Sequence, residues 1–229
     1  MIELKNISFV YEQRQILTDI SLKISEGESV ALLGHNGSGK TTLIKHLNGL
    51  LMPSKGEVIV DGLSTKKNDW EIKKKVGFVF QSPEDQLINS IVEEDIAFGL
   101  ENLGVAPIEM RKRVDAILNA LEISTLAKEN VNNLSFGQKQ LVALAGVLVM
   151  EPKYVVFDEP SSMLDPKNKA NLRKIISNLI KGGTTVLLVT QNLEDILGFK
   201  RIIILDQGRI VFDGKKLSRA VLKKSGLYG

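Results

Sequence analysis

Eight consecutive residues, from Gly34 to Thr41, have the types and spacing of a phosphate-binding loop, with the sequence GHNGSGKT. The apolar run before them, residues 29–33, predicts a short buried strand, and residues 42–49 after them predict a helix closed by glycine. A strand, a glycine-rich loop and a helix in this order form the context that a G-x-x-x-x-G-K-[ST] loop requires.

The chemistry of such a loop follows from its residue types. Glycines at 34, 37 and 39 admit backbone conformations closed to other residues, so successive N–H groups can point at one anion. The helix start adds its positive dipole end. Lys40 can then reach the β- and γ-phosphates, and the Thr41 hydroxyl can bind Mg²⁺. A glycine-rich turn without a ligand is the alternative, and the strand–helix context disfavours it.

Two carboxylates, Asp158 and Glu159, end the apolar run 154–157. In a phosphate-loop fold, an acid at the tip of such a strand lies beside the Mg²⁺ of the nucleotide. An acid that only caps a helix after a core strand is the alternative interpretation.

A third segment, residues 134–138, has the sequence LSFGQ. Ser135 can cap the helix that follows, and Gly137 lets another backbone approach closely. Taken alone, this segment predicts only a well-formed helix N-terminus.

Composition limits the class of protein. The chain has 229 residues, 43% hydrophobic and 25% charged, which is enough for one large globular domain, with or without an insertion. It has no cysteine, which excludes disulfides and thiolate metal sites. Its start lacks a signal-peptide pattern, and its most apolar run, residues 141–150, is about half as long as a membrane span. We therefore expect a chain that can dock onto a membrane protein without crossing the bilayer. The net charge of +3 and the lack of an aromatic-plus-basic pattern argue against nucleic-acid binding.

The elements that must position these motifs can be read from periodicity. Alternating patterns at 2–11 and 16–24 predict an antiparallel pair. Further strands are predicted at 57–61, 76–80, 154–157, 184–190, 201–205 and 210–212. Helices are predicted at 84–100, at 107–121, from just after Ser135, and at 166–180. Strands that alternate with helices predict a mainly parallel sheet covered on both faces, with a mostly helical insertion between about 82 and 151.

The order of the phosphate loop, Gln81, LSFGQ, FDEP, Leu164-Asp165 and a closing strand resembles the nucleotide-binding domain of ATP-binding-cassette (ABC) proteins, from about residue 1 to 215. The resemblance implies an α/β fold of the P-loop NTPase type, in which 1–229 is a single ABC ATPase domain. Residues 1–81 and 152–229 would form the nucleotide-binding core, and 82–151 the helical signature subdomain. The implied cofactors are ATP and Mg²⁺. Because two such domains meet head to tail around two ATP molecules in this family, the implied partner is a second ABC ATPase subunit, identical or different.

The resemblance also implies a role for single residues. Those that bind the phosphates are Gly34, His35, Asn36, Gly37, Ser38, Gly39, Lys40, Thr41 and Thr42. Thr41 and Gln81 resemble the Mg²⁺ ligands, with Asp158 holding the ion through water. Glu159 matches the general base that polarises the attacking water, and Gln81 and Gln191 complete the catalytic set.

Other positions match the family's contacts with the partner subunit and with adenine. Ser135 and Gly137, with Gln138 in the same signature, would meet the ATP held by the partner. Asp165 resembles the loop that links the two sites across the interface. Tyr11 lies where the family places an aromatic ring against adenine, and packing on the core is its alternative role.

Residues 80–87, FQSPEDQL, closely resemble the region after the glutamine loop in ATPases of energy-coupling-factor importers, which take up vitamins and cobalt or nickel ions. There a glutamine-bearing helix contacts the membrane partner, and Gln86 would be its counterpart. The implied function is an ATP-binding and hydrolysing subunit that powers an importer by ATP-driven dimer closure. It would act at the cytoplasmic face of the cell membrane, with an integral membrane coupling subunit bound near Gln81 to Leu100.

Two departures from the family pattern leave an alternative open. Gln191 replaces the usual histidine, and a glutamine can donate a hydrogen bond but cannot become cationic at neutral pH. Its loss of charge corresponds to about 1–3 kcal/mol of transition-state stabilisation. Phe136 stands where the signature normally has glycine, and its side chain could crowd the partner's ATP. The alternative is therefore an ATP-binding regulatory or impaired-site subunit with little hydrolysis of its own.

Overall fold

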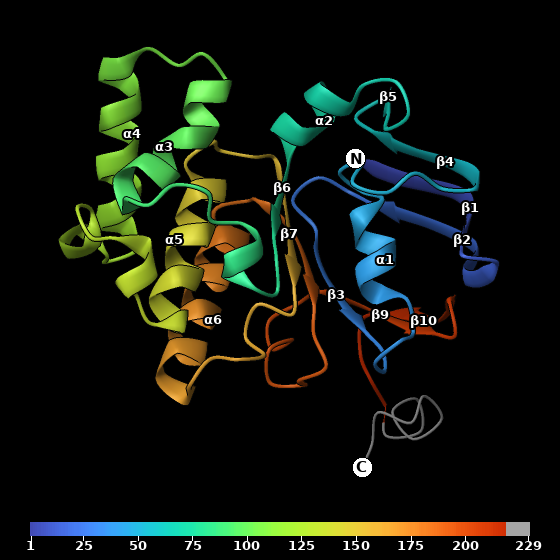
Figure 1. Cartoon of the computed structure of the whole chain (residues 1–229). Helices are drawn as coiled ribbons and strands as arrows, with labels where there is room; N and C mark the ends of the chain where they lie inside the picture. The colour runs from blue at the N-terminus through green and yellow to red at the C-terminus, as the bar shows by residue number, and fades with distance from the viewer. Residues whose placement is uncertain (219–229) are drawn as a thin grey trace.

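The computed structural model describes residues 1–218 and contains two sheets (Figure 1). The six-stranded sheet, in the order β10-β9-β3-β8-β7-β6, is built from β3 (Ser29–Leu33), β6 (Val76–Val79), β7 (Tyr154–Asp158), β8 (Thr185–Val189), β9 (Arg201–Asp206) and β10 (Arg209–Gly214). Its strands pair in parallel except β10, which is antiparallel to β9. The antiparallel four-stranded sheet, in the order β2-β1-β4-β5, is built from β1 (Ile2–Tyr11), β2 (Arg14–Ile24), β4 (Lys55–Val60) and β5 (Leu63–Ser64). The predicted mainly parallel sheet and N-terminal antiparallel region are both confirmed.

The helices lie on both sides of the six-stranded sheet. They are α1 (Lys40–Lys45), α2 (Asp69–Lys75), α3 (Val92–Asn102), α4 (Pro107–Ala120), α5 (Phe136–Leu148) and α6 (Pro166–Lys181), with short 3₁₀ helices η1 (Pro83–Asp85), η2 (Ser124–Leu126) and η3 (Val131–Asn133). In Figure 1, α3, α4 and α5 lie together on one side, and α1 and the antiparallel strands lie on the other.

The side chains of β3 contribute to the hydrophobic core on both faces of the six-stranded sheet. All five of its residues are buried. Ala31 and Leu33 belong to the core cluster that includes α3, α4, α5 and α6, whereas Val30 and Leu32 belong to the cluster that includes β1, β2, β4 and α1. Because successive side chains of a strand point to opposite faces, a strand covered on both sides must be apolar throughout.

Local capping fixes the starts of two helices that matter for the site. Ser135 and Gln138 form a capping box at α5, in which the Gln138 N–H donates to Ser135 Oγ at 3.3 Å and the Ser135 N–H donates to Gln138 Oε1 at 2.9 Å. Asp165 caps α6 by accepting from the Asn168 N–H at 3.0 Å, and Pro166 is the first helical residue. The predicted starts of α5 and α6 are therefore confirmed.

The helix predicted over residues 84–100 is wrong in its first half. Only η1 forms there, and α3 begins at Val92. The side chain of Asp95 accepts the N–H groups of Ile88 at 2.7 Å and Asn89 at 2.8 Å, so the backbone before α3 bonds to a side chain instead of extending the helix. Apolar residues at helical spacing do not reveal such a competing acceptor.

Two smaller differences concern short helices. α1 ends at Lys45, earlier than the predicted helix over residues 42–49, and α2 was not predicted at all. α2 has one buried residue, Ile72, so its sequence carries little of the apolar periodicity that a longer helix shows. Residues 152–229 are predicted to belong to the nucleotide-binding core, and the last of them, 219–229, lie outside the described part of the chain.

Gly208, in the turn between β9 and β10, joins this hairpin to the phosphate loop. Its N–H donates to the Ser38 carbonyl at 3.0 Å, and its carbonyl accepts the Thr18 N–H at 2.9 Å. Its φ is +72°, and a Cβ there would lie 2.1 Å from the Ile16 carbonyl oxygen. This position therefore requires both a left-handed backbone and the absence of a side chain.

We expect Gly208→Ala to lower the free energy of unfolding by about 2–4 kcal/mol, because a backbone clash adds to left-handed strain. Gly62→Ala is the matched control: its φ is +82° and nothing lies within 4 Å of the added Cβ. The control should lose only about 1 kcal/mol. Urea unfolding of both variants measures the difference, and equal losses would show that the close approach at Gly208 is unimportant.

Candidate functional site

Four motif segments meet at one edge of the six-stranded sheet. Gly34 follows β3, Gln81 follows β6, Asp158 ends β7 and Gln191 follows β8. The four strands are neighbours and run parallel, in the order β3-β8-β7-β6. Their carboxyl ends therefore converge, which is where ligands bind in open α/β sheets.

The loop between β3 and α1 is closely packed against β9. A Cβ on Gly34 would lie 2.3 Å from the Leu205 carbonyl oxygen, so only glycine fits there. The Ser38 N–H donates to the His35 carbonyl at 3.2 Å, which closes the loop on itself. The Ser38 hydroxyl oxygen is buried and makes no hydrogen bond within residues 1–218. A buried polar group of this kind normally has a partner, so the loop suits a polar ligand.

Lys40 carries a buried charge at this loop. Its side chain is 5% exposed, and Nζ donates to the carbonyls of Gly34 at 2.9 Å and His35 at 3.0 Å. The same Nζ lies 3.5 Å from Glu159 Oε1. A buried ammonium needs such partners, because desolvation without them is costly. The arrangement fixes a positive charge beside the carboxylate.

Thr41, at the start of α1, and Asp158, at the end of β7, bring two side-chain oxygen atoms together. Thr41 Oγ1 donates to Asp158 Oδ1 at 2.9 Å, and Asp158 is 3% exposed. Burial raises the pKa of the Asp158 carboxyl, and the nearby charge of Glu159 raises it further, whereas the bond from Thr41 lowers it. Gln81 lines the same cavity as Thr41, and its Nε2 donates to Ser162 Oγ at 3.4 Å. A hydroxyl, a carboxylate and an amide oxygen are hard donors of the kind that Mg²⁺ prefers together with phosphate oxygens.

Gln191 links the end of β8 to two parts of the site. Its Nε2 donates to Glu159 Oε1 at 2.9 Å and to Asn36 Oδ1 at 2.6 Å. Glu159 adopts a left-handed backbone with φ of +46°, and its N–H donates to the Val189 carbonyl at 3.0 Å. The amide of Gln191 therefore orients the Glu159 carboxylate. Gln191 occupies the position at which the ABC family usually has a histidine.

A cavity of about 780 Å³ lies in front of these groups. Residues 36, 37 and 39–42 supply part of its wall, and Gln81 and Glu159 line it as well. Sequence reasoning missed other lining residues, namely Arg14, Gln15, Ile16, Thr18, Gln207 and Gly208.

Tyr11 does not line this cavity. It is 59% exposed and lies at the end of β1, where its cross-strand partner is Arg14. Cross-strand partners share one face of a hairpin, so the pairing of residues 11 and 14 could have indicated Arg14 as a candidate.

The signature residues lie apart from this cavity, at the N-termini of α5 and α6. Ser135, Gly137, Gln138 and Asp165 are all absent from the cavity wall. A Cβ on Gly137 would lie 2.6 Å from Asn168 Nδ2, so the two helix starts are in close contact. Phe136 is partly buried and packs against the core cluster that includes α3–α6. A single chain therefore does not bring the signature and the phosphate loop together.

A smaller cavity of about 250 Å³ lies between β6, α3 and α5. Gln86 lines it, but the side-chain amide of Gln86 is already bonded within the chain: Oε1 accepts the Phe80 N–H at 3.1 Å and Nε2 donates to the Ala143 carbonyl at 3.0 Å. Ile88, which also lines the cavity, is 67% exposed. Within residues 1–218, no helix has both the length and the apolar character that a bilayer span requires.

Comparison with known proteins agrees with this geometry. The family model described as ABC transporter matches residues 17–162. The cobalt import ATP-binding protein CbiO of Syntrophus aciditrophicus is 43% identical, over 94% of this chain and 78% of the relative. The energy-coupling factor transporter ATP-binding protein EcfA1 of Clostridium novyi is 44% identical, over 93% of this chain and 79% of the relative.

Solved structures show the same fold. The structure of cbiO1 from Clostridium perfringens, described as part of the ABC transporter complex cbiONQ, has a TM-score of 0.84 and 34% identity, covering 93% of this chain and 88% of that one. The dimeric ATP-binding cassette MJ0796, in a post-hydrolysis state bound to ADP and Pi, has a TM-score of 0.86 and 31% identity, covering 95% of this chain and 100% of that one. With its matching family model and its two close relatives, the chain belongs to the ABC transporter family, as one of its ATP-binding ATPases.

Proposed function

We propose that this chain powers an ABC importer of the energy-coupling-factor type, which takes up a vitamin or cobalt or nickel ions. The observation that carries the proposal is that Lys40 and Glu159 meet at the wall of one cavity, with Asp158 bonded to Thr41 of the same wall. Thr41 Oγ1 lies 2.9 Å from Asp158 Oδ1, and Lys40 Nζ lies 3.5 Å from Glu159 Oε1. The names of the two relatives, a cobalt import protein and an energy-coupling factor protein, support the choice of importer.

ATP would bind with its triphosphate along residues 34–42. The backbone N–H groups and the Ser38 hydroxyl would donate to phosphate oxygens, and Lys40 would exchange its carbonyl partners for the β- and γ-phosphates. Thr41 and Gln81 would hold Mg²⁺ directly, and Asp158 would hold it through water. When bound, Mg²⁺ supplies charge neutralisation for the phosphate oxygens.

Hydrolysis would depend on Glu159 as the general base. Its carboxylate would accept a proton from a water molecule as that water's oxygen forms a bond to the γ-phosphorus, and the bond from that phosphorus to the β–γ bridging oxygen breaks. Gln191 would keep its bond to the carboxylate and exchange its bond to Asn36 for one to the γ-phosphate. The Gln191 amide is neutral, so it would contribute less stabilisation than a cationic histidine.

For ATP binding and hydrolysis to drive a conformational change, a second ABC ATPase subunit would be required. Ser135, Gly137 and Gln138 would meet the ATP bound by that partner, and Asp165 would link the two sites. The separation of the signature from the phosphate loop within one chain favours this arrangement. Binding of ATP would close the dimer, and hydrolysis would reopen it. We propose that 1–229 acts as one ABC ATPase domain, with 82–151 as its signature subdomain.

The membrane subunit would bind near Gln81 to Leu100, on the cytoplasmic face of the membrane. The cavity between β6, α3 and α5 exposes apolar side chains, with Ile88 67% and Phe98 36% exposed. An apolar segment of an integral membrane coupling protein would fill it. Because the Gln86 amide is bonded within the chain, we assign Gln86 to shaping this cavity.

If Glu159 is the base, Glu159→Gln should lower steady-state hydrolysis of MgATP by about a hundredfold or more, because the amide cannot accept the proton. Affinity for MgATP should stay within about threefold of wild type, since the phosphate-binding groups are unchanged. Phosphate release and nucleotide titration measure the two quantities. Equal, very slow hydrolysis by wild type and variant would instead favour the regulatory or impaired-site subunit.

Purification of the chain from its native membrane should recover an integral membrane coupling protein. Ile88→Asp should abolish this recovery, because burial of a carboxylate in an apolar contact is strongly unfavourable. Ile108→Asp is the matched control, since Ile108 is 88% exposed on α4 and lies outside the cavity wall. Recovery of soluble partners alone, or equal effects of the two variants, would count against the proposed importer.

A further inference from the structure

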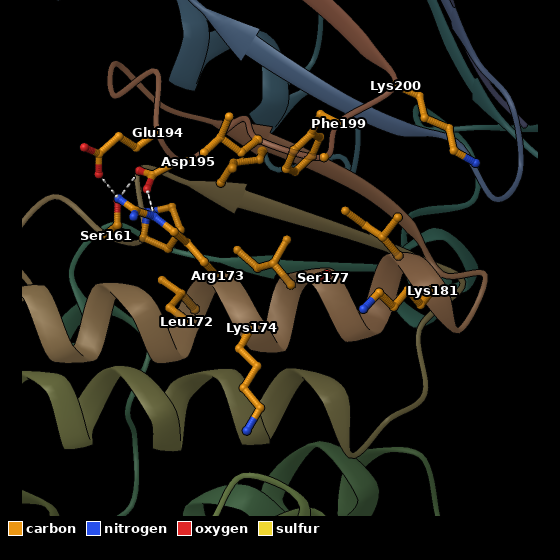
Figure 2. A pocket seen from close by; sticks show the side chains of 16 residues that line it. Ser161, Leu172, Arg173, Lys174, Ser177, Lys181, Glu194, Asp195, Phe199 and Lys200 are labelled. Atoms are coloured by element: carbon orange, nitrogen blue, oxygen red, sulfur yellow. Dashed lines mark hydrogen bonds and ion pairs between the residues drawn. The ribbon is translucent and has the colours of Figure 1, made fainter.

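Asp195 forms a hydrogen-bonded cluster outside the nucleotide cavity, at one end of a separate pocket (Figure 2). Its side chain is 4% exposed. Oδ2 accepts from Ser161 Oγ at 2.6 Å and from Thr190 Oγ1 at 3.1 Å, and Oδ1 accepts from Arg173 Nε at 2.7 Å. One buried carboxylate thus joins three segments of the chain.

Two of these segments carry the groups that the reaction uses. Ser161 comes two residues after Glu159, and Thr190 comes immediately before Gln191. Thr190 Oγ1 also accepts the Asn192 N–H at 3.0 Å, so the hydroxyl holds the turn on both sides of Gln191. The third segment is α6, which contributes Arg173.

The side chains that join these two turns border a pocket. Ser161, Arg173 and Asp195 line a pocket of about 650 Å³ that lies between α6 and the segment 194–200. In Figure 2 the side chains of Ser161, Arg173 and Asp195 converge at one end of this pocket. Side chains that border a cavity lack partner atoms on that side, so their hydrogen bonds contribute more to holding them in position.

We propose that Asp195 is a positioning residue for ATP hydrolysis. The backbone bond from the Glu159 N–H to the Val189 carbonyl joins the ends of β7 and β8, and Asp195 joins the two turns beyond it by holding Ser161 and Thr190 on one carboxylate oxygen. The contact of 2.9 Å between Gln191 Nε2 and Glu159 Oε1 depends on the relative position of these turns. Asp195 touches no part of the nucleotide cavity, and the inference rests on the proposed role of Glu159 as the base.

We expect Asp195→Ala to lower kcat for MgATP hydrolysis about ten- to a hundredfold, because a small misplacement of the base slows the reaction by this amount. KM and nucleotide affinity should stay within about twofold, since the phosphate loop is unchanged. Glu194→Gln is the matched control: Glu194 also pairs with Arg173, at 2.9 Å, but is 70% exposed and does not contact Ser161 or Thr190. Its kcat should stay within about twofold of wild type.

Repeating the Asp195→Ala substitution in a Gln191→Ala variant distinguishes a positioning role from a general loss of structure. In Gln191→Ala, whose contact with Glu159 is already gone, adding Asp195→Ala should lower kcat by less than about twofold further. If the full loss persists there, or if folded Asp195→Ala keeps the wild-type kcat, the inference is wrong.

A smaller change covers the case in which Asp195→Ala does not fold. Thr190→Val removes one hydroxyl from the cluster and should lower kcat with KM unchanged, whereas Thr190→Ser restores the hydroxyl and should recover the wild-type value. Wild-type kcat in both variants would overturn the inference while leaving the proposed function intact. If wild type is no faster than Glu159→Gln, the proposed function fails, and the inference fails with it.

Discussion

The buried ammonium of Lys40 is the constraint around which the site is arranged. At 5% exposure it needs partners in every direction, and it has two loop carbonyls and the carboxylate of Glu159. Gly34, which supplies one of those carbonyls, lies directly against the Leu205 backbone of β9. A residue that binds this positive charge is therefore also one that a close approach between two backbones requires to be glycine.

The rest of the fold brings negative and neutral groups to that charge. Parallel strands β3, β8 and β7 are neighbours, so the loop after β3, Gln191 after β8 and Asp158 at the end of β7 lie at the same edge. Both faces of these strands are covered, which leaves their carboxyl ends as the open side. The carboxylate of Asp195 then connects the β7 and β8 turns from outside the cavity.

Sequence reasoning predicted the parts of this arrangement that are written in local patterns. Apolar runs predicted the buried strands, Ser135 predicted the start of α5, the pattern at 166–180 predicted α6, and the loop motif predicted Lys40 and Thr41. It failed where the deciding contact is not written in such a pattern. The Asp95 side chain replaces the first half of the predicted helix by accepting backbone N–H groups, which apolar spacing does not reveal. The approach of Arg14 to the cavity and the Ser161–Asp195 bond depend on residues that only folding brings together.

We propose that a triphosphate binds along the loop before Lys40, with its metal beside Thr41 and Asp158. A crystal structure of Glu159→Gln grown with ATP and magnesium tests it most directly, because slow hydrolysis preserves the nucleotide. We expect density for the phosphates within hydrogen-bond distance of the loop N–H groups and Lys40 Nζ, and a metal ion against Thr41 Oγ1. An empty or collapsed cavity under saturating nucleotide, or a nucleotide bound elsewhere, would contradict the account.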